Sequence, residues 1–350
     1  MISLISFLIV ISICVLAHEG GHYLAAKWRG VLVHEFAFGM GPVIWSKQRG
    51  ETRWSLRAFP IGGFVSLEGE DAEVEHKAGA SAAPVDSSRS LLYKKPWERF
   101  VILFSGAFVN LVLAWFLTAA LLVGSGVYDM SRPAIGAVIT GTPAQEAGLR
   151  PGDVIKSING VTLTEWGDIR KNLQNPEMPF DVFTFVIERD GENTEKRINI
   201  QPIEGQGRLL GVQPTRIHYS PYRALRHGIS YSWEMGVDII RGMWMTVTGQ
   251  IEADVVGPVG IAVMAGDAFR RGLWSFLAFM GVINLHLGIL NLLPFPALDG
   301  GRLIFVLFEM VTRRKIPEKW EAYLHMAGFM VLIALIVLIT GKDIIRLFNN

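Results

Sequence analysis

Cysteine is almost absent from this chain, and charge is scarce. The single cysteine, Cys14, excludes a disulfide framework and a zinc site built from several thiolates, so any metal must be held by histidines and carboxylates. Charged residues make up 19% of the 350 residues, whereas soluble domains carry about 25%. The 33 basic and 32 acidic residues nearly cancel, and without a clustered basic field we expect no nucleic-acid partner. Half of the residues are apolar, which indicates a membrane protein that lies in a lipid bilayer.

Four stretches approach the length of about 20 predominantly apolar residues that a membrane-spanning helix needs. They are residues 1–26, 100–123, 273–293 and 322–340. The first has neither a basic segment before its apolar run nor a small-residue cleavage site, so we interpret it as a retained span and not as a signal peptide. We therefore expect four transmembrane helices.

Basic residues close to the spans predict their orientation. Lys27, Arg29 and Lys94 flank the connection between spans one and two, and Arg313 and Lys315 flank the one between spans three and four. Short connections rich in Lys and Arg stay in the cytoplasm. Both termini and the long segment between spans two and three should then lie outside it.

The segments between the spans divide the chain into expected domains. Residues 1–127 form a first membrane part that includes a β-hairpin loop at 31–68, and residues 132–203 form a small soluble domain with short β-branched runs. Residues 204–271 form a linker with an amphipathic helix suited to a membrane interface, and residues 272–350 form a second membrane part.

The first span ends in the sequence His-Glu-Gly-Gly-His. Positions i and i+4 share one face of a helix, so His18 and His22 can reach one Zn²⁺ while Glu19 lies beside them as a general base. The alternative is a chance match on a polar surface helix, which is disfavoured because ionisable groups at the end of an apolar span are costly. A catalytic zinc usually has three protein ligands and one open position.

Asp299 is the best candidate for the third ligand. It follows two prolines that break the third apolar stretch and precedes Gly300 and Gly301, which let the backbone turn. Unwound backbone at membrane depth is tolerated only where protein or a water-filled cavity satisfies it. The alternative is an ordinary helix cap for the helix that starts near Arg302.

Together these segments resemble the bacterial site-2 protease family of intramembrane zinc metalloproteases. The motifs that carry the resemblance are HEGGH, the run Gly39-Met-Gly-Pro, the run Pro60-Ile-Gly-Gly-Phe-Val, the run Gly257-Pro-Val-Gly-Ile-Ala and the run from Asn291 to Gly301, NLLPFPALDGG. The segment Thr142-Pro-Ala-Gln-Glu-Ala-Gly-Leu-Arg-Pro-Gly-Asp is similar to a PDZ domain.

The resemblance implies a fold and a set of site residues. The fold is an α-helical membrane protein with four transmembrane helices, a membrane-associated β-hairpin or sheet and an inserted α+β PDZ-like domain. One zinc per chain would be held by His18, His22 and Asp299, with Glu19 as the catalytic base. The implied substrate-binding residues are Asn291, Gly39, Gly41 and His286. His286 stands where relatives often have Asn, and we expect it to hydrogen-bond to backbone or substrate, because a third histidine ligand would close the open zinc position.

The predicted activity is hydrolysis of a peptide bond within transmembrane segments of single-span membrane proteins, such as anti-sigma factors or signal-peptide remnants. The resemblance also implies the bacterial cytoplasmic (inner) membrane, a site toward the cytoplasmic side and an upstream site-1-type protease as an optional partner. We expect strands at 36–38 and 52–59 to hold an unwound substrate by edge pairing or to form a structural sheet over the cavity. Two rival functions remain: a membrane-anchored PDZ adaptor with a structural metal site, and a zinc transporter.

Overall fold

The computed structural model describes residues 1–70, 87–175, 181–203, 207–251 and 255–349. The chain divides into two compact units, of which unit 1 comprises Met1–Ala119 with Leu225–Asn350 and unit 2 comprises Ala120–Ala224. The boundaries fall inside two long helices, α3 (Pro96–Gly124) and α6 (Pro221–Val247). Each unit is described by itself below.

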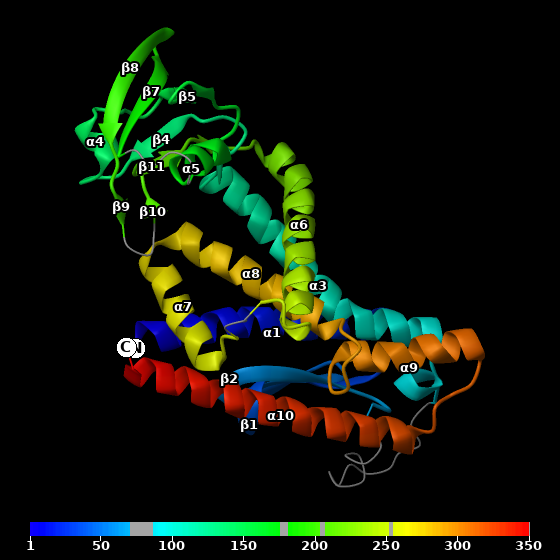
Figure 1. Cartoon of the computed structure of the whole chain (residues 1–350). Coiled ribbons are helices and arrows are strands. Elements are labelled where there is room, and N and C mark those ends of the chain that lie inside the picture. Colours follow the sequence, from blue (N-terminus) through cyan, green and yellow to red (C-terminus); the bar gives the residue numbers. More distant parts are fainter. Residues whose placement is uncertain (71–86, 176–180, 204–206, 252–254, 350) are drawn as a thin grey trace. The chain divides into compact units, whose positions relative to one another are not determined.

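Four helices of the described residues are long and apolar enough to cross a membrane, as the sequence predicts. They are α1 (Ile2–Trp28), α3, α8 (Leu273–Asn291) and α10 (Glu318–Asn349) (Figure 1). Most side chains of α10 are exposed, whereas α3 and α8 bury a larger share of theirs. Apolar residues on an exposed helix face fit a lipid environment.

The third apolar stretch is broken where its two prolines stand. Helix α8 ends at Asn291, and α9 (Asp299–Thr312) begins after the irregular segment 292–298. Gly300 and Gly301 allow that segment to pack against the start of α9, because a Cβ at Gly300 would lie 2.0 Å from the Leu293 carbonyl oxygen and one at Gly301 would lie 2.5 Å from that of Phe295. The sequence therefore places Asp299 at the first turn of a new helix.

Helix α7 (Pro258–Arg270) packs against α1, and a Cβ at Gly266 would lie 2.3 Å from the Ser3 hydroxyl oxygen. Its N-terminus is closed by a carboxylate from α10. Asp343 accepts the backbone N–H groups of Gly257 at 3.2 Å and Gly260 at 2.8 Å. The first N–H groups of a helix have no intrahelical partner, and Asp343 supplies the acceptor for these two. A Cβ at Gly257 would lie 2.8 Å from Asp343 Oδ2 and one at Gly260 would lie 3.3 Å from it, so glycine lets the carboxylate approach.

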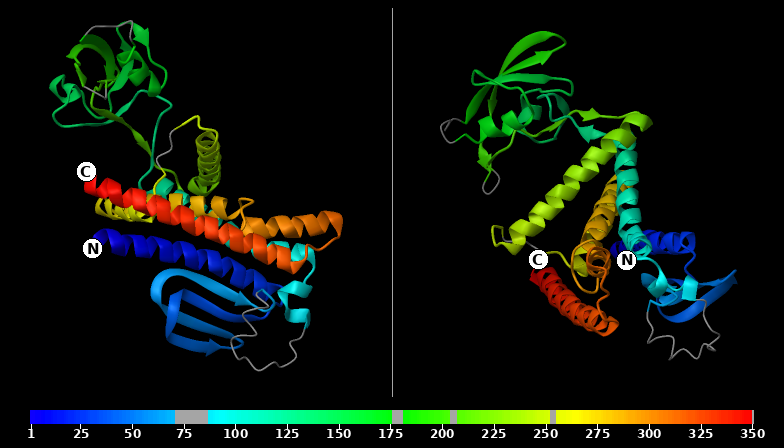
Figure 2. Two further views of the ribbon diagram at one scale, coloured as in Figure 1. Left: turned by 60° about the horizontal axis from the view of Figure 1, so that its bottom comes forward. Right: turned by 90° about the vertical axis from the view of Figure 1, so that its right-hand side faces the viewer.

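The sheet of unit 1 follows α1 in the chain and packs against it (Figure 2). Strands β1 (Val33–Arg49) and β2 (Thr52–Leu67) are long and bulged, so that Phe36 lies opposite both Val65 and Trp54. The segment 35–38 is thus paired on both sides, and so is 53–56 of β2. The expectation of edge pairing by 36–38 and 52–59 is therefore wrong for 36–38 and for 53–56, because both segments have a partner on each side. The outer segments are 43–49 and 63–67.

Apolar side chains are exposed where β1 bends. These residues are Met40, Val43, Ile44, Trp45 and Phe59. An exposed cluster of this kind fits contact with lipid, as expected for a membrane-associated sheet. The 3₁₀ turns η1 (Ser87–Arg89) and η2 (Leu91–Tyr93) lead from the end of the sheet region to α3.

Unit 2 has an apolar core of its own, in which Phe183, Phe185 and Ile155 are fully buried. Its four-stranded antiparallel sheet has the order β6-β5-β7-β8. Those strands are β5 (Val154–Ile158), β6 (Val161–Thr162), β7 (Val182–Arg189) and β8 (Glu192–Asn199). Two short helices, α4 (Pro143–Glu146) and α5 (Gly167–Leu173), accompany the sheet.

Unit 2 is wider than the segment 132–203 expected from the sequence, because later strands pair with earlier ones. Strand β11 (Val212–Pro214) pairs with β4 (Ile135–Val138), and β12 (Arg216–Ile217) pairs with β3 (Val127–Tyr128). A hairpin of β9 (Pro202–Ile203) and β10 (Gly207–Arg208) lies between them in the chain. The β3–β12 pair brings the two ends of the unit together.

Candidate metal centre

Helix α1 carries the His-Glu-Gly-Gly-His segment, residues 18–22, in its second half. His22 is buried and His18 is partly buried. Their Nε2 atoms lie 3.3 Å apart, which shows that both rings point to the same place. This is the outcome that the i, i+4 spacing predicts.

Asp299 approaches the same place from the start of α9. Its Oδ2 lies 3.1 Å from His18 Nε2 and 3.2 Å from His22 Nε2. Leu298 takes the N-cap position of α9 and no side-chain capping hydrogen bond is found there, so Asp299 does not act as the helix cap. Among the residues that the structure describes, these three side chains form a group that could hold a metal ion.

The geometry of the three groups fits zinc. Ligand atoms about 2.0–2.1 Å from a tetrahedral zinc lie about 3.3 Å from one another, and the three atoms here are separated by 3.1 to 3.3 Å. Apart from the two imidazoles, the buried Asp299 Oδ2 has no polar partner among the described residues, and a metal ion would compensate the three groups together. Two imidazoles and one carboxylate are a ligand set that zinc accepts.

Helix α3 forms the wall behind the two histidines. Nδ1 of His22 donates to the Ile102 carbonyl oxygen at 2.8 Å, which fixes the ring so that Nε2 faces Asp299. A Cβ at Gly106 would lie 2.3 Å from His22 Nε2 and 2.9 Å from His18 Cε1. Gly21 of α1 is equally confined, since a Cβ there would lie 2.3 Å from the Ser105 carbonyl oxygen. Glycine is therefore required at 21 and 106 for the two helices to meet at the site.

Asn291, the last residue of α8, is buried beside His18. Its Nδ2 lies 3.5 Å from His18 Nδ1. When His18 presents the Nε2 lone pair to a metal, its Nδ1 carries the proton, and rotating the Asn291 amide turns its oxygen toward that proton. Asn291 can thus orient His18 as the Ile102 carbonyl orients His22.

Glu19 is partly buried between α1 and the sheet. A Cβ at Gly63 of β2 would lie 3.6 Å from Glu19 Cγ and 2.8 Å from the Ala37 carbonyl oxygen. The sheet therefore approaches the helix closely where the acidic side chain begins. This close approach places β2 next to Glu19, the residue expected to act as a base.

The glycines at the bend of β1 have a structural reason to be there. Gly39 and Gly41 have φ angles of 85° and 84°, and a Cβ at either would lie within 2.7 Å of a Phe59 atom. Arg57 holds the bend by donating to the Gly41 carbonyl oxygen at 2.9 Å and to Glu35 at 2.7 Å. Burial raises the pKa of the Glu35 carboxyl, but hydrogen bonds from Arg53, Ser55 and Arg57 outweigh it and hold the pKa below its ordinary value.

The remaining expected site residue, His286, lies on α8 and uses Nδ1 to bond the Val282 carbonyl oxygen at 2.9 Å, within its own helix. No described contact joins His286, Gly39 or Gly41 to the three ligands. Three residues that the motifs did not reveal also contact the site or the turn beside it: Gly106, Ile102 and His325. The glycine in the second span was the one available signal, because glycine weakens a helix unless something approaches it.

Comparison with known proteins agrees with this geometry. The sequence matches Peptidase family M50 over residues 6–335. A Clostridium perfringens protein that carries the provisional name of a zinc metalloprotease is 35% identical over 352 residues, which cover 97% of each chain. The "Regulator of sigma-W protease RasP" of Bacillus subtilis is 28% identical over 423 residues, which cover 99% of each chain. The match spans both membrane parts and the segment between them.

Among solved structures, the PDZ domain of an SdrC-like protein from Listeria innocua is 21% identical to the matched segment. The match covers 27% of this chain and 99% of that one, with a TM-score of 0.21.

Proposed function

Because this chain belongs to Peptidase family M50 and is a zinc metalloprotease of the site-2 type, we propose that it cleaves single-span membrane proteins within their transmembrane segments. One observation carries the proposal. The three ligands come from the end of one apolar span, α1, and from the break that follows another, α8. Such a site lies at membrane depth, where a hydrolase meets a transmembrane segment.

The residues have separate roles in the proposed reaction. His18, His22 and Asp299 would hold the zinc, which when bound activates water and polarises the scissile carbonyl. Glu19 takes the proton from the attacking water and returns it to the leaving amine. The Ile102 carbonyl orients the ring of His22, and Asn291 orients the ring of His18. We therefore propose a positioning role for Asn291, whereas the sequence predicts a contact with substrate.

The sheet supports a role in holding the substrate extended. A helical segment hides its backbone and must unwind before a peptide bond can reach the site. The outer segment 63–67 of β2 pairs on one side with β1, and no described strand pairs with its other side. A substrate strand added there would gain main-chain hydrogen bonds, and Gly63 would place it close to Glu19. Gly39 and Gly41 would then affect substrate binding indirectly, because they allow the bend of β1 that shapes the sheet.

The location and partners follow from the same proposal. We place the chain in the bacterial cytoplasmic membrane, with the site toward the cytoplasm. Both termini and unit 2 then lie outside the cytoplasm, because the short connections between the spans are rich in Lys and Arg. The name of the Bacillus subtilis relative points to a sigma-factor pathway in that organism. Anti-sigma factors and signal-peptide remnants are therefore the first substrates to test, with and without prior cutting by a site-1-type protease. Unit 2, with its own core, would restrict which substrates enter.

One experiment separates this function from its rivals. The purified chain and its Glu19→Gln and Asp299→Ala variants are reconstituted in liposomes with zinc and a panel of single-span peptides. We expect cleavage by the native chain alone, zinc retention by Glu19→Gln and weak zinc binding by Asp299→Ala. An adaptor would bind peptides and leave them intact, and a transporter would move zinc across the liposome without cleavage. Either result contradicts the proposal, and so does cleavage by Glu19→Gln at the native rate.

A further inference from the structure

The turn before Asp299 has an unusual backbone. Ala297 has a φ of 79°, a left-handed conformation that a residue with a side chain adopts only when its surroundings hold it. The Ala297 N–H donates to Nδ1 of His325 on α10, over a distance of 3.0 Å. An imidazole from a distant helix therefore holds the backbone two residues before the proposed ligand.

Helix α10 is shaped for this contact. Gly328 lies one turn after His325, on the same face, and a Cβ there would lie 2.4 Å from the Pro296 carbonyl oxygen. Any larger residue would push the helix away from the turn. Most of α10 is exposed and suits contact with lipid. The face that carries His325 and Gly328 differs from the rest of the helix, because it packs closely against Pro296 and Ala297.

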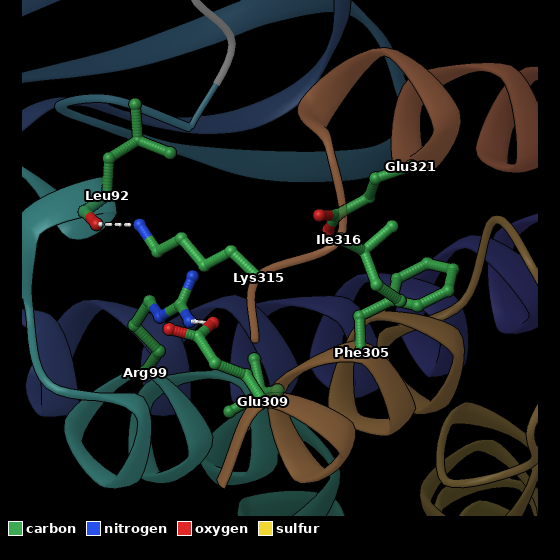
Figure 3. Close-up of a pocket in the computed structure, with 8 residues that line it drawn as sticks. Leu92, Arg99, Phe305, Glu309, Lys315, Ile316 and Glu321 are labelled. Carbon is green, nitrogen blue, oxygen red and sulfur yellow. Dashed lines mark hydrogen bonds and ion pairs between the residues drawn. The ribbon is translucent and has the colours of Figure 1, made fainter. Parts of the chain in front are cut away.

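The ring of His325 is itself held in place. It packs edge-on against Phe305 of α9, with the ring centroids 5.8 Å apart and the planes at 80°. Nε2 lies 4.0 Å from Glu321 Oε1 and has no hydrogen-bond partner among the described residues. Figure 3 shows Phe305 and Glu321 on one side of a small cavity of about 40 Å³. Because Nδ1 accepts from Ala297, the ring proton belongs on Nε2.

We propose that His325 is a positioning residue for the metal centre: it holds the left-handed turn at Ala297 and so fixes the Asp299 carboxylate beside His18 and His22. The turn at Ala297 lies two residues before Asp299, the first residue of α9, so its backbone conformation sets the position of that carboxylate. Groups that orient a metal ligand from outside the ligand set change metal affinity by about 10- to 100-fold when they are removed. The inference rests on the proposed role of Asp299 as a ligand.

The test compares three substitutions at one position. His325→Asn keeps an acceptor atom near the place of Nδ1, His325→Gln moves it to the place of Nε2, and His325→Leu removes it. Each variant is purified in detergent, loaded with Zn²⁺ or Co²⁺, and examined for the rate of metal loss to a chelator and for the visible spectrum of the bound cobalt. Tyr323→Leu is the control, because it removes an exposed ring from the same helix.

We expect the Leu and Gln variants to lose metal about 10- to 100-fold faster and to show an altered cobalt spectrum, while the Asn and Tyr323 variants stay close to the native chain. A native spectrum and native metal loss in the Leu variant would overturn the proposal. If the Leu variant does not fold, equal behaviour of the Asn and Gln variants would overturn it. Native metal binding in Asp299→Ala would instead overturn the ligand assignment itself, which keeps the two failures distinct.

Discussion

Gly106→Ala is expected to damage the metal centre although residue 106 binds no metal. The added Cβ would lie 2.3 Å from His22 Nε2 and 2.7 Å from His22 Cε1, whereas non-bonded heavy atoms in contact lie about 3.5–4.0 Å apart. The added Cβ is therefore about 1.2 Å too close to Nε2 and about 0.8 Å too close to Cε1, measured against a contact distance of about 3.5 Å. His22 cannot swing away without losing its bond to the Ile102 carbonyl oxygen, so α3 or the ring must move by about that amount.

The size of the effect follows from this displacement. Misplacing a reacting group by about 1 Å costs about 100-fold in rate, which corresponds to about 2.7 kcal/mol of activation free energy. Zinc affinity should fall by about 10- to 100-fold, because both imidazoles lose their orientation. The assay is zinc content after a timed chelator challenge, followed by the rate of peptide cleavage.

Gly20→Ala is the matched control for zinc content. It adds the same methyl group to α1, but no atom would lie within 4 Å of it. It should keep native zinc affinity and stabilise the helix by about 1 kcal/mol. If Gly106→Ala binds zinc as tightly as the native chain, the close approach of α3 to the two histidines is not a requirement of the site, and this reasoning is refuted.

Three further predictions concern the rest of the chain. Asp343→Ala should lower the free energy of unfolding by about 1–2 kcal/mol, because two N–H groups of α7 lose their acceptor; an unchanged melting temperature would contradict this. Cysteines placed at Ser88 and Glu192 in a Cys14→Ser background should react with an impermeant reagent from opposite sides of the membrane, and labelling of both from one side would refute the four-span topology. Replacing Val127–Ile217 with a short linker should preserve zinc binding and cleavage of a short peptide while speeding cleavage of substrates with bulky outer domains; loss of cleavage by a folded, zinc-bound variant would show that unit 2 is needed for catalysis.

The sequence alone predicted the features that depend on local spacing. The four spans follow from uninterrupted apolar runs, and the shared face of His18 and His22 follows from the helical repeat. The prediction of Asp299 as a ligand combined two observations: the prolines break the third apolar stretch just before it, and the two histidines lack the third ligand that zinc usually has. The structure brings all three together.

Contacts between spans were not predictable in the same way. An apolar helix in lipid has no polar face to show which side meets a neighbour. Gly106 is a signal that something approaches the second span closely, but the sequence does not show that the approaching group is the pair of histidines. The bond between Ala297 and His325 joins residues from different elements, and His325 belongs to none of the motifs. The order of segments in the sheet depends on bulges that let Phe36 pair on both sides, which alternation of side chains does not reveal.

The proposed site cuts its substrate within a transmembrane segment. The most direct test is to measure by mass spectrometry the fragments that the zinc-loaded chain releases from a single-span substrate, beside the zinc-loaded Glu19→Gln variant. We expect a cut inside the apolar segment of the substrate with the native chain and an intact substrate with the variant. Fragments that end only outside the apolar segment, or the same fragments from the variant at the native rate, would contradict it.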